Sequence, residues 1–237
     1  MTHPFSERQR SVAAAAVASL VLSIGASLLV PGAYGFDMQA LAHPGSIVDD
    51  GQGVADVLRW GALLDMVSYL PLAVVVVYVH YRLRDRNPLL VGVMTAGGLA
   101  YVLIGSLAGA LLASVGPPLI EGYAEATAAG QEAARVSLES IGNATFVGLW
   151  GTLELIGIGA WFLGVGWLLW SEWRPFAALS ILAGVGTLSA SLRTGLTGRT
   201  IVDVDGPLDL AILGAAGCLV LWEMWLAVRL WRGSPDR

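Results

Sequence analysis

The chain contains no lysine, one cysteine and three histidines among its 237 residues. Without lysine it cannot form a Schiff base with retinal or pyridoxal phosphate, and it lacks the essential residue of a phosphate-binding P-loop. Its single cysteine, Cys218, excludes an internal disulfide, a redox pair and a thiolate zinc site. Among the histidines only His80 lies in an apolar segment, which is too few for a bis-histidine haem or a histidine-box metal centre. We therefore expect neither a cofactor nor a metal.

Charged residues are also scarce, at 13% of the chain, whereas 56% of the residues are hydrophobic. An ordinary soluble domain has about 25% charged residues, so this composition indicates an integral membrane protein. A helix that crosses the hydrocarbon layer needs about 20 predominantly apolar residues. Six such segments occur, approximately at 11–30, 57–80, 88–115, 143–170, 175–192 and 207–231. The sequence predicts one all-α domain, residues 1–237, built as a bundle of six transmembrane helices.

The arginines gather at every second junction between these segments, and this pattern predicts the orientation of the chain. Arginines concentrate on the cytoplasmic side of membrane proteins. They lie at the two ends of the chain and in the second and fourth junctions: Arg8, Arg10, Arg82, Arg84, Arg86, Arg174, Arg229, Arg232 and Arg237. The other loops, 31–56, 116–142 and 193–206, are mainly acidic and are predicted to lie outside. We expect both termini to be cytoplasmic, in the cell membrane, and an acidic outer face with no nucleic-acid partner.

Two segments allow alternatives. The first apolar segment could be a cleaved secretory signal, but its 20 residues exceed the usual signal core of 7 to 15, so we expect it to be retained as a span. The loop 116–142 is rich in alanine and glutamate, which favours a helix. That helix would either lie over the mouth of the bundle or serve as a surface connector.

Ionisable residues inside the predicted spans are the candidates for function. Asp65, Glu154 and Asp209 each lie in the outer half of a span. An acidic residue near the bilayer centre costs on the order of 2.5 to 3.5 kcal/mol, so it normally faces the bundle interior with a partner or a proton. We therefore expect these carboxyl groups to point inward.

A short similarity links two of these acids. The segment Trp60-Gly61-Ala62-Leu63-Leu64-Asp65 resembles Trp150-Gly151-Thr152-Leu153-Glu154, and each is followed by an arginine-bearing turn with a proline. Both segments begin on the predicted outer side, so they would represent a parallel duplication. With Asp209, three carboxyl groups could meet near the outer mouth of the bundle. Chance resemblance between glycine-rich helices is the alternative.

The expected role of these acids depends on their partners. Arg193, at the end of the fifth predicted span, could pair with Asp65 or Glu154 and serve only structure. Alternatively, an acid that stays unpaired could bind or relay a cation or a proton, or bind the amine of a ligand. Tyr69 is a polar neighbour that could belong to either network.

A family resemblance rests on the region from Trp150 to Leu192. It has a glycine-bearing span with Gly164-Val165-Gly166, a short turn with Ser171 and Pro175, and a return helix with Leu182-Ala183-Gly184-Val185-Gly186. This region resembles the bacterial membrane family called domain of unknown function 4386, and the arginine-rich turn from Arg82 to Pro88 fits the same layout. The resemblance implies the six-helix arrangement and carries no activity.

We expect a non-enzymatic membrane protein, either a transporter-like bundle that binds a small solute or a cation or proton, or a component of such a system. The alternative is a structural or interaction subunit of a membrane complex whose buried acids only fix the helices. An intramembrane aspartyl protease is disfavoured because Asp65 is the only mid-span aspartate. The expected partners are membrane lipid and a small solute or cation, with a homo-oligomer or a membrane complex left open.

Overall fold

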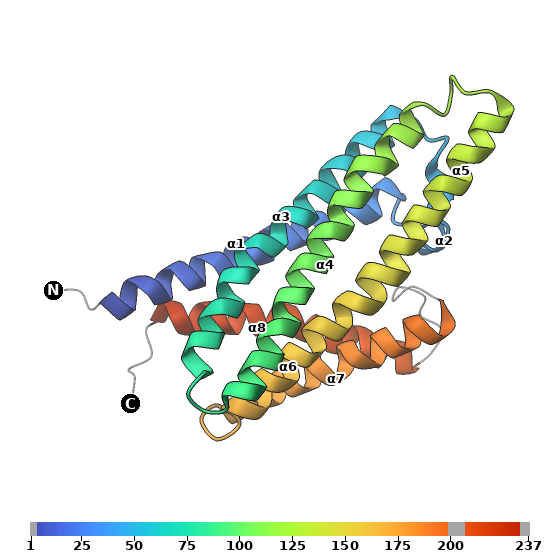
Figure 1. The fold of residues 1–237 in the computed structure, drawn as a ribbon. Coiled ribbons are helices and arrows are strands. Elements are labelled where there is room, and N and C mark those ends of the chain that lie inside the picture. Colours follow the sequence, from blue (N-terminus) through green and yellow to red (C-terminus); the bar gives the residue numbers. More distant parts are fainter. Residues whose placement is uncertain (1–3, 199–206, 233–237) are drawn as a thin grey trace.

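A computed structural model describes residues 4–198 and 207–232, and within these ranges the chain is helical without strands (Figure 1). The elements are α1 (Pro4–Ala33), α2 (Met38–Ala42), the short 3₁₀ helix η1 (Pro44–Ile47), α3 (Gln52–Leu83), α4 (Pro88–Glu121), α5 (Ala128–Asn143), the π-helix η2 (Ala144–Glu154), α6 (Leu155–Leu169), α7 (Arg174–Thr197) and α8 (Pro207–Arg232). The all-helical prediction is confirmed.

Within the described residues, five helices are long and apolar enough to cross a membrane: Glu7–Ala33, Gln52–Leu83, Pro88–Glu121, Ala128–Leu169 and Arg174–Thr197. Several of their large apolar side chains are exposed, as expected for a surface that faces lipid. The protein is therefore a multi-pass membrane protein by length and composition. The sixth predicted span, 207–231, coincides with α8, and its role as a span remains a prediction.

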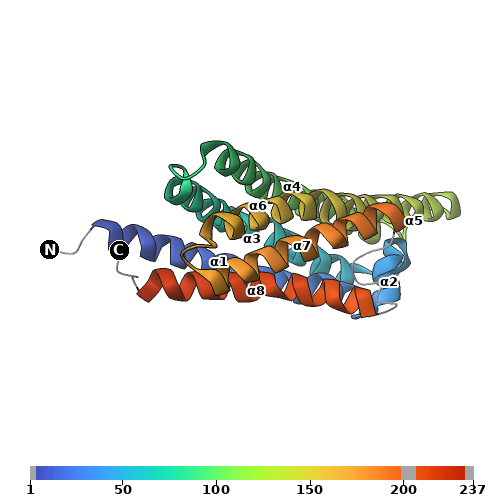
Figure 2. The ribbon, with the colours of Figure 1, turned by 90° about the horizontal axis from the view of Figure 1, so that it is seen from below.

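Both ends of the described chain lie at one end of the bundle, which we call the terminal end (Figures 1 and 2). The turns between α3 and α4 and between α6 and α7 lie there as well, so the arginine-bearing junctions share this end. At this end Arg86 donates to the carboxylate of Glu172 and to the carbonyl of Leu168, which joins the two turns. The opposite end, which we call the α5 end, carries α2, η1 and α5.

The predicted outer loop 116–142 is largely helical, as its composition indicates, but its helix does not lie across the bundle. Helix α4 continues past Pro117 and Pro118 before it ends at Glu121. The hydroxyl of Thr127 then accepts a hydrogen bond from the Gly130 amide and caps α5. Helix α5 runs without a break into η2 and α6, so it extends the fourth span instead of covering the bundle mouth.

Glycines allow the helix backbones to approach closely. A Cβ atom built at Gly97 of α4 would lie 2.7 Å from the carbonyl oxygen of Gly157, and one at Gly157 would lie 2.8 Å from the carbonyl oxygen of Gly97. Between α6 and α7, a Cβ atom at Gly184 would lie 3.0 Å from the carbonyl oxygen of Gly159. In lipid, such close packing is a main source of helix association, because no hydrophobic force drives apolar helices together.

The buried apolar side chains form two clusters, one toward each end of the bundle. The cluster toward the terminal end is centred on Trp222, whose ring centroid lies 5.0 Å from that of Trp161 and 5.1 Å from those of Phe162 and Phe176. The indole of Trp222 donates to the hydroxyl of Ser180 at 2.7 Å. The cluster toward the α5 end contains Leu58, Leu112 and Leu138, among others.

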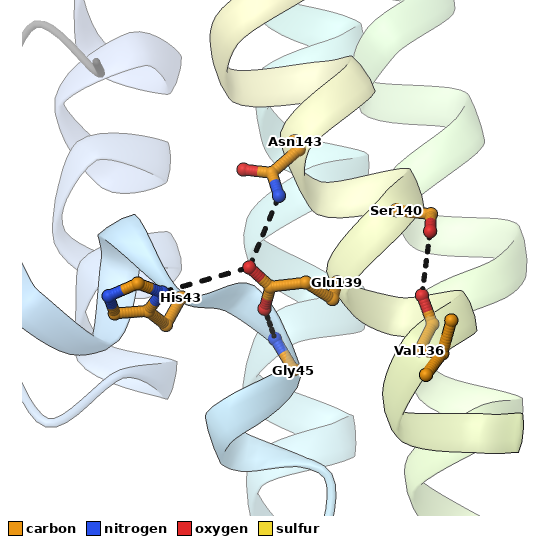
Figure 3. A network of polar contacts seen from close by, with 6 residues as sticks. All are labelled: His43, Gly45, Val136, Glu139, Ser140 and Asn143. Atoms are coloured by element: carbon orange, nitrogen blue, oxygen red, sulfur yellow. Dashed lines mark hydrogen bonds and ion pairs between the residues drawn. The ribbon is translucent and has the colours of Figure 1, made fainter. Parts of the chain in front are cut away.

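Glu139 of α5 fixes the segment after α2 against the bundle (Figure 3). Its carboxylate accepts hydrogen bonds from the Gly45 amide at 2.7 Å and from the Asn143 side chain at 3.1 Å, and it lies 3.8 Å from Nδ1 of His43. A Cβ atom at Gly45 would lie 2.8 Å from the carbonyl oxygen of Arg135, so glycine permits this contact.

Burial, with the nearby Glu139 charge, raises the pKa of the Tyr34 hydroxyl well above its ordinary value.

Candidate functional site

A cavity of about 320 Å³ lies between α1, α3 and η2. It is lined by the last third of α1, one residue of α2, one face of α3 and the π-helix: Ala26, Ser27, Val30, Pro31, Leu41, Asp65, Tyr69, Phe146, Trp150 and Gly151. Most of these side chains are apolar. The cavity borders both apolar clusters, since Tyr69 belongs to one and Leu41 to the other.

Asp65 is the only acidic side chain among the described residues that line the cavity. Its Oδ2 atom is buried and has no hydrogen-bond partner among the described residues. A carboxylate in a low-dielectric interior is unstable alone and is stabilised by a cation or a proton. The site therefore presents an acceptor for positive charge.

Glu154 lies behind the cavity and is joined to it by Tyr69. The glutamate side chain is 6% exposed, and its Oε1 atom accepts a hydrogen bond of 2.9 Å from the Tyr69 hydroxyl. Its Oε2 atom is buried without a partner, and the carboxyl group is close enough to Asp65 for the two to interact electrostatically. The ring of Tyr69 packs edge-on against Tyr101, with centroids 5.2 Å apart. The two acids therefore differ, because only Asp65 lines the cavity itself.

Proline and the π-helix shape the cavity wall. Pro31 has no amide hydrogen, so the carbonyl of Ser27, four residues earlier, lacks its usual helical donor. In η2 the Thr152 hydroxyl donates to the carbonyl of Val147, five residues earlier, at 2.7 Å. Short π-helical segments often occur at functional sites. This one places Trp150 and Gly151 on the cavity.

The remaining sequence candidates are not gathered at the cavity. Arg193 is half-buried in α7 and is not among the described residues that line the cavity, so its pairing with Asp65 or Glu154 stays a prediction. Asp209 belongs to α8, but its side chain lies outside the described part of the protein. Three carboxyl groups at one mouth thus remain a hypothesis.

The two segments of the suggested duplication place their tryptophans differently. Trp60 is 65% exposed on the outer surface of α3, whereas Trp150 lines the cavity. A regular α-helix carries one segment and a π-helix the other, so equal spacing in the sequence does not give equal orientation.

Residues 11–233 match the family described as a domain of unknown function (DUF4386). The chain belongs to the DUF4386 family. The match covers nearly the whole sequence, as the resemblance in the span from Trp150 to Leu192 indicated. No curated protein and no solved structure matches this DUF4386 protein.

Sequence reasoning missed most of the cavity wall. Ser27, Phe146 and Trp150 line the cavity of the DUF4386 protein, yet none stands out in an apolar sequence. The sequence similarity between the Trp150 and Trp60 segments does not indicate that Trp150 faces a cavity. A π-helix has no distinct residue pattern that would have shown the inward position of its ring.

Proposed function

We propose that this DUF4386 protein is a transporter-like bundle that binds a small solute, a cation or a proton at Asp65 within the cavity. In this proposal the chain spans the cell membrane six times with both termini cytoplasmic, so the α5 end faces outward. The arginine-bearing turns at the terminal end support that orientation. The observation that carries the proposal is the buried Oδ2 atom of Asp65, which has no hydrogen-bond partner among the described residues and belongs to a residue that lines a cavity inside a membrane bundle.

The proposed roles of the two acids follow from their contacts. Asp65 would contact the bound species directly, because it lines the cavity. Glu154 would hold the Tyr69 hydroxyl in place by accepting its hydrogen bond. Through the same hydrogen bond it could relay a proton to or from the cavity. Asp209 and Arg193 remain candidates for the entrance to the site.

The test measures cation-dependent stabilisation of purified protein in nanodiscs. Wild type is heated with sodium, ammonium or small organic cations, and across a pH series. We expect at least one of these conditions to raise the Tm of the wild type and to leave the Tm of Asp65→Asn unchanged. Asp85→Asn is the matched control, because Asp85 lies on an exposed turn at the terminal end. A Tm of wild type that responds to none of these conditions would refute the proposal.

The second candidate is a structural or interaction subunit of a membrane complex. The Tyr69–Glu154 hydrogen bond favours it, because this bond links α3 to η2 and would fix their register. Under this alternative, Glu154→Gln and Asp65→Asn reduce the yield of folded protein without affecting any cation response. Normal yield with a lost response would contradict it.

A further inference from the structure

The walls of the cavity indicate which kind of cation it would take. Phe146 and Trp150 line it together with Tyr69, and the first two rings pack against each other with centroids 5.3 Å apart. Aromatic faces attract cations, and tryptophan does so most strongly, particularly where water is excluded. Phe146 also contacts Tyr34 edge-on, at 6.0 Å between centroids, which holds its ring in place.

The size and polarity of the cavity point the same way. A volume of about 320 Å³ is near the lower end for small-molecule sites, and most of its lining is apolar. A hard metal cation prefers several oxygen ligands, whereas Asp65 supplies the only carboxyl group among the described lining residues. No group of three potential metal ligands occurs among the described residues. An ion with an apolar body would fill this space and contact the rings.

From this arrangement we propose that the occupant is a small monovalent organic ammonium ion, with its charge at Asp65 and its apolar body against Trp150 and Phe146. One carboxylate balances one positive charge. The carbonyl of Ser27, which lacks its helical donor, is an additional acceptor near the site. This inference rests on the proposed function, because it names the substrate class of the same cavity.

The chain offers a matched pair of tryptophans for the test. Trp150 lines the cavity, whereas Trp60, also followed by glycine, is exposed on the outer surface. Binding of ethylammonium, tetramethylammonium and sodium is measured by isothermal titration calorimetry in nanodiscs. We expect both ammonium ions to bind more tightly than sodium to wild type. Trp150→Leu should weaken their binding about tenfold, as expected for loss of one cation–π contact. Trp60→Leu should bind them like wild type.

The outcomes separate this inference from the proposed function. If sodium or protons bind in an Asp65-dependent manner and the organic ions do not, the inference is wrong and the proposed function stands. If Trp150→Leu binds organic ammonium ions as tightly as wild type, the inference is also wrong. If no cation binds, both fail. Because Trp150→Leu could be unstable, Trp150→Phe is measured as well: it retains a ring and should keep most of the affinity.

Discussion

Gly105 of α4 controls the position of Tyr69, so an alanine there tests the site without altering any polar group. A Cβ atom at Gly105 would lie less than 3.0 Å from three atoms of the Tyr69 ring. The ring would have to move, and the 2.9 Å bond from its hydroxyl to Glu154 would break or lengthen. Overpacking costs about 1–3 kcal/mol. Loss of the hydrogen bond adds about 1 kcal/mol. The better helix propensity of alanine offsets about 1 kcal/mol.

We therefore expect Gly105→Ala to lower the free energy of unfolding by about 1–3 kcal/mol. The control is Gly92→Ala in the same helix, where a Cβ atom would meet nothing within 4 Å. That substitution should be neutral or slightly stabilising. Unfolding in mixed micelles with increasing dodecyl sulfate measures both. In a Tyr69→Ala background, Gly105→Ala should cost almost nothing. Equal stability of the two single variants, or an unchanged cost in that background, would refute this packing.

Two further predictions concern the two ends of the bundle. Glu139→Ala removes the acceptor for the Gly45 amide, which should cost about 1–3 kcal/mol and make residues 31–56 more sensitive to limited proteolysis. Glu132→Ala, an exposed position on the same helix, is the control, and equal digestion of the two variants would contradict the role of Glu139. Trp222→Ala should cost about 3–5 kcal/mol because it empties the centre of an aromatic cluster. Trp231→Ala, at a position 62% exposed, should change stability little, and similar values for both tryptophans would show that this cluster is packed differently.

Hydrophobicity predicted the class of this protein well, because the membrane imposes a simple rule on long apolar segments. Five such helices and the all-helical fold follow directly from that rule. The extent of the helices was less predictable. Gly116-Pro117-Pro118 suggests an end to the helix, yet α4 continues to Glu121. Helices of membrane proteins tolerate proline where neighbouring groups satisfy the freed backbone carbonyls.

The site was predictable in part. The cost of a buried carboxyl group singled out Asp65 and Glu154, and Tyr69 was recognised as their polar neighbour. The cavity itself depends on features that composition does not encode, namely the π-helical turn at Trp150 and the loss of a helical donor at Pro31. The periodicity of a regular α-helix predicts neither the π-helical turn nor the lost donor. The exposure of Trp60 shows the same limit of prediction, because its segment is similar in sequence to that of Trp150 and yet its side chain lies outside the bundle.

The central claim is that the cavity admits cations to Asp65, and the rate of cysteine modification tests it most directly. Ser27 is exposed and lines the cavity, so Ser27→Cys in a Cys218→Ser background places a single thiol there. Leu28→Cys, on the neighbouring exposed residue outside the lining, is the control. We predict that the ratio of the modification rates of a trimethylammonium methanethiosulfonate and its sulfonate analogue is about tenfold higher for Cys at position 27 than for Cys at position 28, and that Asp65→Asn lowers the ratio at position 27 to the value at position 28. The same ratio at both positions, or no modification at position 27, would contradict the account.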